Sequence, residues 1–213
     1  MGSSRRVVIL VSGRGSNMEA LLAARLPIEV VAVISNRAAA AALPLAAAQG
    51  IVTRVVPSAD FTDRIDYDEA LRQVIDEYAP DLVVLAGFMR LLTPGFVNHY
   101  RQRLLNIRPS LLPAFTGLHT HRRALEEGVC VHGCTVHFVT DELDGGPIVA
   151  QGVVPVSSAD DEESLGQRVL AVEHQLYPKV LQAWAEDRLH WVSPERVILR
   201  AEQENFPRVL WGK

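Results

Sequence analysis

The first 35 residues alternate between short apolar runs and a helix-forming segment. Residues 6–12 read Arg-Val-Val-Ile-Leu-Val-Ser, and the glycine-containing stretch 13–17 separates them from the helix-forming segment 18–24. A continuous apolar run of this length is typical of a strand buried on both faces. A second such run follows at 28–35. Strand, helix and strand in this order predict parallel strands joined by a helical crossover.

The same alternation continues along the chain and predicts an α/β fold with a mostly parallel, doubly wound, Rossmann-like sheet. Residues 188–200 have the pattern of a hairpin, and 201–213 form a tail. The length of 213 residues favours a single domain. Further strands are expected at 52–56, 81–88, 104–108, 130–139 and 148–156, and further helices at 38–49, 64–78 and 122–127. The stretch 158–164 is expected to cap a last helix that continues to about residue 187.

The charge of the chain limits the kinds of molecule it is expected to bind, and its cysteines indicate a cellular location. The net charge of −4 gives no general attraction to nucleic acid or to an anionic membrane surface. No apolar run reaches the roughly 18 residues that a membrane span requires. Cys130 and Cys134 lie four apart in an expected strand, about 13 Å between Cα atoms, which is too far for a disulfide. A reducing, cytoplasmic location is expected.

The stretch Gly13-Arg-Gly-Ser-Asn17 offers backbone N–H groups at a helix N-terminus, with Ser16 or Asn17 as the expected cap. Such a turn is suited to binding an anion such as phosphate. It lacks the third glycine of a dinucleotide fingerprint and the Gly-Lys-Ser/Thr of a Walker loop. A glycine turn that only tightens the connection remains an alternative at this point.

The strand beginning at Leu104 carries two polar side chains at its carboxyl end. Asn106 and Arg108 are two residues apart and therefore project from one face, whereas Ile107 points to the other. Pro109 ends the strand. Open α/β sheets bind their ligands at this edge.

Further polar groups are available to a site at that edge. Asp144 precedes Gly145-Gly146-Pro147, where turn formation is the ordinary explanation for an aspartate. His119 and His121 lie in a loop rich in Pro, Gly and His. With Asn106 and Arg108, these residues offer an amide donor, a fixed cation, two titratable rings and an acid. That set suits acyl-group transfer, in which an oxyanion is stabilised and a proton is moved.

Two other groups require an interpretation. Glu173 falls on or beside the apolar face of the last expected helix, so this buried carboxylate is structural or substrate-binding. Cys130, His132 and Cys134 share a strand face and raise the alternative of a metal site. Their spacing is unusual for zinc, and core cysteines on a strand are the ordinary explanation. No metal is expected.

Several segments together resemble the folate-dependent phosphoribosylglycinamide formyltransferase family over nearly the whole chain. The family's mostly parallel α/β fold agrees with the alternation of strands and helices. The resemblance implies transfer of a formyl group from 10-formyltetrahydrofolate to the amine of glycinamide ribonucleotide in purine biosynthesis. The segments that carry it are Val11–Asn17, Asp81–Arg90, Leu105–Pro113, Gly117–His121, Gly133–Pro147 and Glu173-His174 before Tyr177-Pro178.

The resemblance also implies residue roles. The part up to about residue 100 would bind the ribonucleotide phosphate through Gly15, Ser16 and Asn17, and the part from about 101 to 200 would be catalytic and folate-binding. Glu173 would bind the glycine amine side. Asn106 and Asp144 match two of three catalytic positions, with a water held by Asp144 relaying the proton towards N10. The folate slot would comprise Arg64, Phe88, Met89, Arg90, Leu92, Val97, Leu104, Val139, Thr140 and Asp141.

The third catalytic position departs from the family pattern, because Arg108 stands where the family has histidine. Histidine exchanges a proton near neutral pH, whereas arginine stays protonated. Arg108 is suited to pair with Asp144 and to stabilise an oxyanion, but it is a poor proton donor. Reduced activity is therefore expected. Thr116 is a second, smaller departure, since the family usually has proline there.

Related functions remain as alternatives. Formyltetrahydrofolate deformylases resemble the same site but hydrolyse the folate, and they carry an additional N-terminal domain. A catalytically impaired folate- or nucleotide-binding homologue is the other alternative. Methionyl-tRNA formyltransferase is disfavoured by the acidic charge of the chain. The expected partners are small-molecule substrates, with no nucleic acid and no membrane, in a monomer or homodimer.

Overall fold

The computed structural model describes residues 4–199 and 208–212. The chain divides into two compact units, residues 1–106 and 107–213. Each unit is described by itself below. The expectation of a single domain, and the roles assigned to its parts before and after about residue 100, remain predictions.

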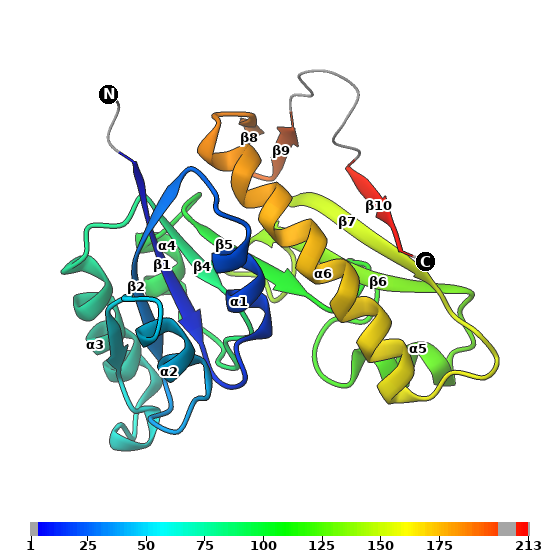
Figure 1. Ribbon diagram of the computed structural model, residues 1–213, viewed down its shortest axis with the longest axis horizontal. Helices are drawn as coiled ribbons and strands as arrows, with labels where there is room; N and C mark the ends of the chain where they lie inside the picture. The colour runs from blue at the N-terminus through cyan, green and yellow to red at the C-terminus, as the bar shows by residue number, and fades with distance from the viewer. Residues whose placement is uncertain (1–3, 200–207, 213) are drawn as a thin grey trace. The chain divides into compact units, whose positions relative to one another are not determined.

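The first unit contains a parallel sheet in the order β5-β4-β1-β2-β3 (Figure 1). All residues from Val7 to Val11 of β1 have no solvent exposure. Because successive strand residues point to opposite faces, both faces of β1 are covered. The continuous apolar run therefore predicted its strand correctly. The strands are β1 (Arg5–Val11), β2 (Ile28–Ser35), β3 (Thr53–Val55), β4 (Leu82–Leu85) and β5 (Leu104–Arg108), the last crossing the boundary at Asn106.

The helices of this unit connect the parallel strands. Tyr67, Leu71 and Ile75 lie on one stripe of α3 and are fully buried, as their helical spacing predicts. The helix expected at 38–49 is shorter, because only 42–47 is helical. The helices are α1 (Ser16–Ala23), α2 (Ala42–Ala47), α3 (Arg64–Asp76) and α4 (Pro94–His99), with a 3₁₀ turn, η1 (Ser58–Asp60).

The second unit is built on an antiparallel pair, β6 (Val131–Phe138) and β7 (Ile148–Pro155). The long helix α6 (Glu162–Ala185) packs on these two strands, as Figure 1 shows. The expected hairpin is present as β8 (Leu189–Ser193) and β9 (Arg196–Leu199). The mostly parallel character of the fold is confirmed, and β6–β7 and β8–β9 are antiparallel pairs.

The start of one helix and the tail differ from the sequence-based prediction, whereas the start of the long helix agrees with it. The stretch 158–164 caps the long helix, as predicted, because α6 begins at Glu162 and Asp161 forms a reciprocal capping pair with Ser164. Helix α5 (Thr120–Glu126) begins two residues before the expected start. The tail contains a strand, β10 (Val209–Trp211), which pairs in parallel with β7. Residues 200–207 and 213 lie outside the described residues.

The N-terminus of α1 corrects one prediction. Gly15, not Ser16 or Asn17, is the N-cap residue, and no side chain caps the helix. Gly15 has a left-handed φ of 84°, and a Cβ at this position would lie 2.5 Å from the Cβ of Ala42. Glycine is therefore required both by the backbone conformation and by the close approach of α2.

Replacing Gly15 by alanine tests this packing. Gly15→Ala is expected to lower the free energy of unfolding by about 1–3 kcal/mol, because the new methyl group is both strained and overpacked. Chemical denaturation measures the change. The matched variant is Gly13→Ala in the same turn, where a Cβ meets nothing within 4 Å. Equal unfolding free energies of the two variants would contradict this explanation.

Candidate functional site

The carboxyl ends of β1 and β2 are joined by a buried polar network that the sequence did not indicate. The Ser12 hydroxyl donates to Oδ1 of Asn36 at 2.6 Å. Ser12 Oγ also accepts from the backbone N–H of Met89 at 2.8 Å. Ser12 and Asn36 are 3% and 5% exposed. The network therefore fixes the segment after β4, which carries Phe88, Met89 and Arg90.

The predicted phosphate-binding residues lie together at the start of α1. Gly15 and Ser16 are half-buried and Asn17 is buried. The first N–H groups of a helix have no partner within the helix, and the helix dipole adds partial positive charge there. The local structure is therefore suited to an anion, and phosphate binding by these residues stays a prediction.

The predicted folate residues of the first unit differ widely in exposure. Arg64 is the first residue of α3 and is exposed, and Met89 is 73% exposed. Phe88 and Leu92 are half-buried. Val97 and Leu104 are 4% and 0% exposed and belong to the core. A role in the core is enough to explain why Val97 and Leu104 are apolar. Direct contact of these two residues with a ligand remains a prediction.

Arg90 is held by Tyr67, an aromatic residue of the buried stripe of α3. The Arg90 guanidinium carbon lies 4.4 Å from the ring centre of Tyr67, a cation–π geometry. Tyr67 is fully buried and packs edge-on against Phe61 at 5.6 Å. Burial raises the pKa of Tyr67, and the Arg90 charge opposes this shift. The stack restricts the guanidinium and leaves it half-buried.

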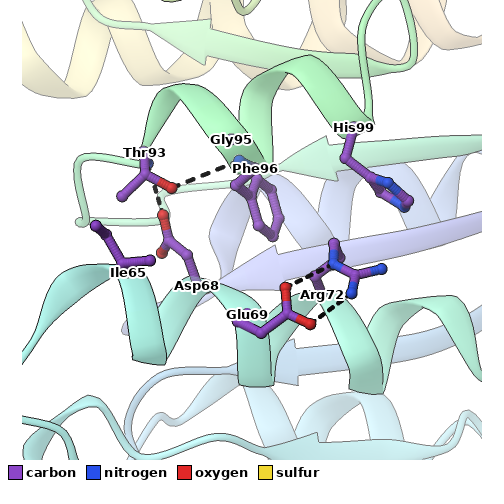
Figure 2. A pocket seen from close by; sticks show the side chains of 8 residues that line it. All are labelled: Ile65, Asp68, Glu69, Arg72, Thr93, Gly95, Phe96 and His99. Atoms are coloured by element: carbon purple, nitrogen blue, oxygen red, sulfur yellow. Dashed lines mark hydrogen bonds and ion pairs between the residues drawn. The ribbon is translucent and has the colours of Figure 1, made fainter.

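A cavity of about 210 Å³ lies between α3 and α4 (Figure 2). Its charged groups are paired locally, since Arg72 contacts Glu69 at 2.5 Å and Asp68 accepts from the Thr93 N–H at 2.6 Å. The cavity contains none of the residues predicted for the ribonucleotide or the folate. Its remaining lining residues are Ile65, Gly95, Phe96 and His99.

Arg108 and Asp144 form an ion pair in the second unit. Arg108 Nε lies 3.0 Å from Asp144 Oδ2, and the two side chains are 16% and 7% exposed. Nε makes no aligned hydrogen bond, so the contact is an ion pair without hydrogen-bond geometry. Burial lowers the pKa of Arg108, whereas Asp144 raises it. The predicted pairing of the two residues is confirmed.

The turn that carries Asp144 depends on its glycines. Asp144 has a φ of 56°, in the left-handed region that aspartate tolerates. A Cβ at Gly146 would lie 1.8 Å from the Phe138 carbonyl oxygen, and one at Gly145 would lie 2.6 Å from the Glu142 side chain. The turn therefore both folds the chain tightly and directs the carboxylate towards Arg108.

The remaining predicted folate residues, Val139, Thr140 and Asp141, connect β6 to the Asp144 turn. Val139 and Thr140 are half-buried and Asp141 is exposed. His137, which the sequence did not single out, precedes them and is 1% exposed. Burial lowers the pKa of His137, and the charges of Asp144 and Arg108 act on it in opposite directions. A neutral histidine thus lies in the electrostatic environment of the ion pair.

Glu173 is 5% exposed on α6, so the predicted inward position is confirmed. Its charge acts on two buried neighbours. Burial raises the pKa of Cys134, and Glu173 raises it further. Burial also raises the pKa of Tyr177, and the charge of Glu173 raises it further. Cys134 therefore stays a thiol at neutral pH.

The chain is similar to known proteins over most of its length. A family model described as formyl transferase matches residues 5–181. The chain is 51% identical over 201 residues to phosphoribosylglycinamide formyltransferase of Escherichia coli K12, covering 90% of this chain and 95% of that protein. The chain belongs to the formyl transferase family.

Two further relatives of this formyl transferase differ in size. The human trifunctional purine biosynthetic protein adenosine-3 is 45% identical over 202 residues. The matched region comprises 89% of this chain and 20% of that protein. A crystal structure of phosphoribosylglycinamide formyltransferase from Anaplasma phagocytophilum is 41% identical with a TM-score of 0.90. It covers 98% of this chain, and 99% of that chain is matched.

The formyl transferase has no membrane-spanning helix within residues 4–199 and 208–212. Over the same residues, no group of three or more His, Cys, Asp or Glu side chains is placed to hold a metal ion. Both cysteines are free, and Cys130 is exposed whereas Cys134 is buried. The absence of a disulfide between them was predicted correctly.

The two loop histidines of the formyl transferase have separate positions. His119 is exposed and is the N-cap residue of α5, with a φ of 56°. His121 lies within α5 and packs edge-on against the buried ring of His132, with 5.3 Å between ring centres. Burial lowers the pKa of His121. His121 therefore helps to attach α5 to β6.

His132 predicts a pH dependence of stability. It is fully buried, and burial lowers its pKa from 6.5 to about 4, with a further contribution from His121. Between these values the unfolded chain binds a proton that the folded chain does not. The contribution of His132 to the free energy of unfolding is therefore complete above pH 6.5. It decreases as the pH falls towards 4, by an amount on the order of 3 kcal/mol.

Urea denaturation of the parent chain and His132→Gln at a series of pH values measures this dependence. Between pH 6.5 and 4, the free energy of unfolding of the variant is expected to decrease less than that of the parent chain, because glutamine does not titrate. The same slope in both proteins would show that other groups cause the acid sensitivity.

Proposed function

We propose that this formyl transferase transfers the formyl group of 10-formyltetrahydrofolate to the amine of glycinamide ribonucleotide, a step of purine biosynthesis. The observation that carries the proposal is the 51% identity to the E. coli enzyme over 95% of its length. The local structures at the predicted residues support it, because they offer an anion-binding turn, a buried ion pair and a buried carboxylate.

The proposed roles follow the chemistry of each group. Gly15, Ser16 and Asn17 bind the phosphate of the ribonucleotide through the N-terminus of α1. Glu173 binds the glycine amine side, for which a buried carboxylate is suited. Arg90, restricted by Tyr67, is suited to an anionic group of the folate. Together with Arg90, the proposed folate-binding residues of the first unit are Arg64, Phe88, Met89, Leu92, Val97 and Leu104, and those of the second are Val139, Thr140 and Asp141.

The transfer requires an oxyanion to be stabilised and a proton to be moved. The amine attacks the formyl carbon, the carbonyl electrons move to oxygen, and the bond from carbon to N10 breaks as N10 gains a proton. The Asn106 amide and the Arg108 guanidinium are suited to stabilise the oxyanion. Asp144 accepts the amine proton through a water and returns it to N10. Arg108 contributes charge but no proton.

The alternatives differ in what accepts the formyl group. A deformylase would transfer it to water, and an impaired homologue would bind ligands without turnover. The relative from E. coli and the solved structure from A. phagocytophilum are both named as formyltransferases, which favours transfer to the ribonucleotide. A cytoplasmic monomer or homodimer, acting on small molecules without metal, nucleic acid or membrane, completes the proposal.

Replacement of the proposed proton acceptor tests the function. Asp144→Asn is expected to lower kcat with both substrates by about 10²-fold to 10³-fold, because an amide cannot accept the proton. Steady-state turnover measures this, after circular dichroism has confirmed folding. Glu142→Gln, an exposed change in the same turn, is the matched control and is expected to keep the parental kcat. A fully active Asp144→Asn protein would contradict the assigned role.

Replacement of Arg108 tests the effect of the permanent charge. Arg108→His is expected to increase kcat, by up to about 10²-fold, because imidazole exchanges a proton near neutral pH. The measurement is turnover of parent and variant at saturating glycinamide ribonucleotide and 10-formyltetrahydrofolate. If the parent chain already turns over as fast as the variant, Arg108 does not impair the reaction.

A further inference from the structure

The turn Phe115–Gly117 lies between two arginines that reach it from different elements. Arg108 Nη2, from the end of β5, donates to the Phe115 carbonyl at 3.4 Å and to the Gly117 carbonyl. Arg123 Nη1, from α5, donates to the Thr116 carbonyl at 2.6 Å. Three consecutive carbonyl oxygens of one turn thus accept hydrogen bonds from two guanidinium groups.

The same turn contacts the carboxylate of the ion pair. The Gly117 N–H donates to Asp144 Oδ2 at 3.2 Å, the oxygen that also faces Arg108 Nε. Phe115 has a φ of 54°, a left-handed conformation that costs energy for a residue with a side chain, so the turn needs support from its surroundings. The position of Asp144 Oδ2 therefore depends on the turn as well as on Arg108.

Arg123 has no role in the predictions made from the sequence. Its guanidinium carbon also lies 5.6 Å from the ring centre of Phe115, and its side chain extends from a regular helix turn, since the Arg123 N–H donates to the His119 carbonyl. Helix α5 is attached to its surroundings through His121, which packs on His132. Gly166 of α6 lies close to the same His121 ring. Arg123 thus connects a fixed helix to the turn.

The charges explain why two arginines are placed so near each other. Burial is the main cause of the lowered pKa of Arg108, and the Arg123 charge lowers it further, so the two cations repel. The Phe115, Thr116 and Gly117 carbonyl dipoles and the Asp144 carboxylate offset this repulsion. Hydrogen bonds with a charged donor are about twice as strong as neutral ones, which makes each contact significant for a short turn.

We propose that Arg123 is a positioning residue of the transfer reaction, which holds the Phe115–Gly117 turn so that the Gly117 N–H orients the Asp144 carboxylate. The proposal rests on the proposed function, because Asp144 matters only if it moves the proton. Arg123 itself touches no reacting atom. Its effect is therefore expected on kcat and not on the binding of either substrate.

Three variants of the full chain test the proposal. Arg123→Gln removes the charge and weakens the bond to the Thr116 carbonyl, and it is expected to lower kcat by roughly tenfold to a hundredfold with KM values unchanged within twofold. Arg123→Lys restores a cationic donor and is expected to recover part of kcat. The control is Arg122→Gln on the same helix, whose side chain is 54% exposed and pairs with Glu162 at the surface.

Hydrogen exchange of the Gly117 amide gives a readout that does not depend on catalysis. In the ligand-free protein, Arg123→Gln is expected to speed this exchange at least about tenfold relative to Arg122→Gln, as the hydrogen bond to Asp144 opens more often. Unchanged exchange, or a kcat equal to that of Arg122→Gln, would overturn the proposal. Loss of ribonucleotide-dependent transfer in the parent chain would instead overturn the proposed function and leave the exchange result valid.

Discussion

The buried ion pair between Arg108 and Asp144 is the interaction on which the site in the second unit depends. Its carboxylate is placed by a turn in which Gly146 has no room for a Cβ because of the Phe138 carbonyl oxygen, and its guanidinium comes from the end of β5. Removing one partner of such a pair leaves an uncompensated charge and costs about 3–5 kcal/mol. Stability and catalysis are therefore linked at this position, and both must be measured for any variant of it.

The choice of arginine has consequences beyond the charge itself. A guanidinium presents donors in several directions, so Arg108 contacts Asp144 and also two carbonyl groups of the Phe115–Gly117 turn. A histidine ring has only two nitrogens and reaches less far. The residue that weakens proton exchange thus adds contacts that hold the turn. We infer that Arg108 shifts the site from proton exchange towards electrostatic and positional stabilisation.

Much of the fold could be predicted from the sequence because local patterns determine it. The run ending at Val11 required a strand buried on both faces, and helical spacing placed Glu173 inside. The pairing of Arg108 with Asp144 followed from opposite charges that the family resemblance brought together. Ser16 or Asn17 as the cap of α1 was wrong, because the choice of Gly15 depends on how closely Ala42 approaches. That approach is a tertiary contact with no local signal.

Other features required the structure for the same reason. The strand β10 forms through backbone pairing with β7 and carries too short an apolar pattern to be recognised. Tyr67 matched the core stripe of α3, and its second role beneath Arg90 involves a residue from another segment. No sequence pattern distinguishes Arg123 from the neighbouring Arg122. Only the position of α5 shows that it donates to the carbonyl of Thr116.

The central claim is that the formyl group passes to the ribonucleotide amine. Its most direct test is a single-turnover reaction of the purified parent chain with 10-formyltetrahydrofolate labelled in the formyl carbon, in the presence of glycinamide ribonucleotide. The account predicts that the label appears in the N-formylated ribonucleotide, with one folate released for each formyl group transferred. Label recovered as formate, at a rate that does not depend on the ribonucleotide, would contradict it.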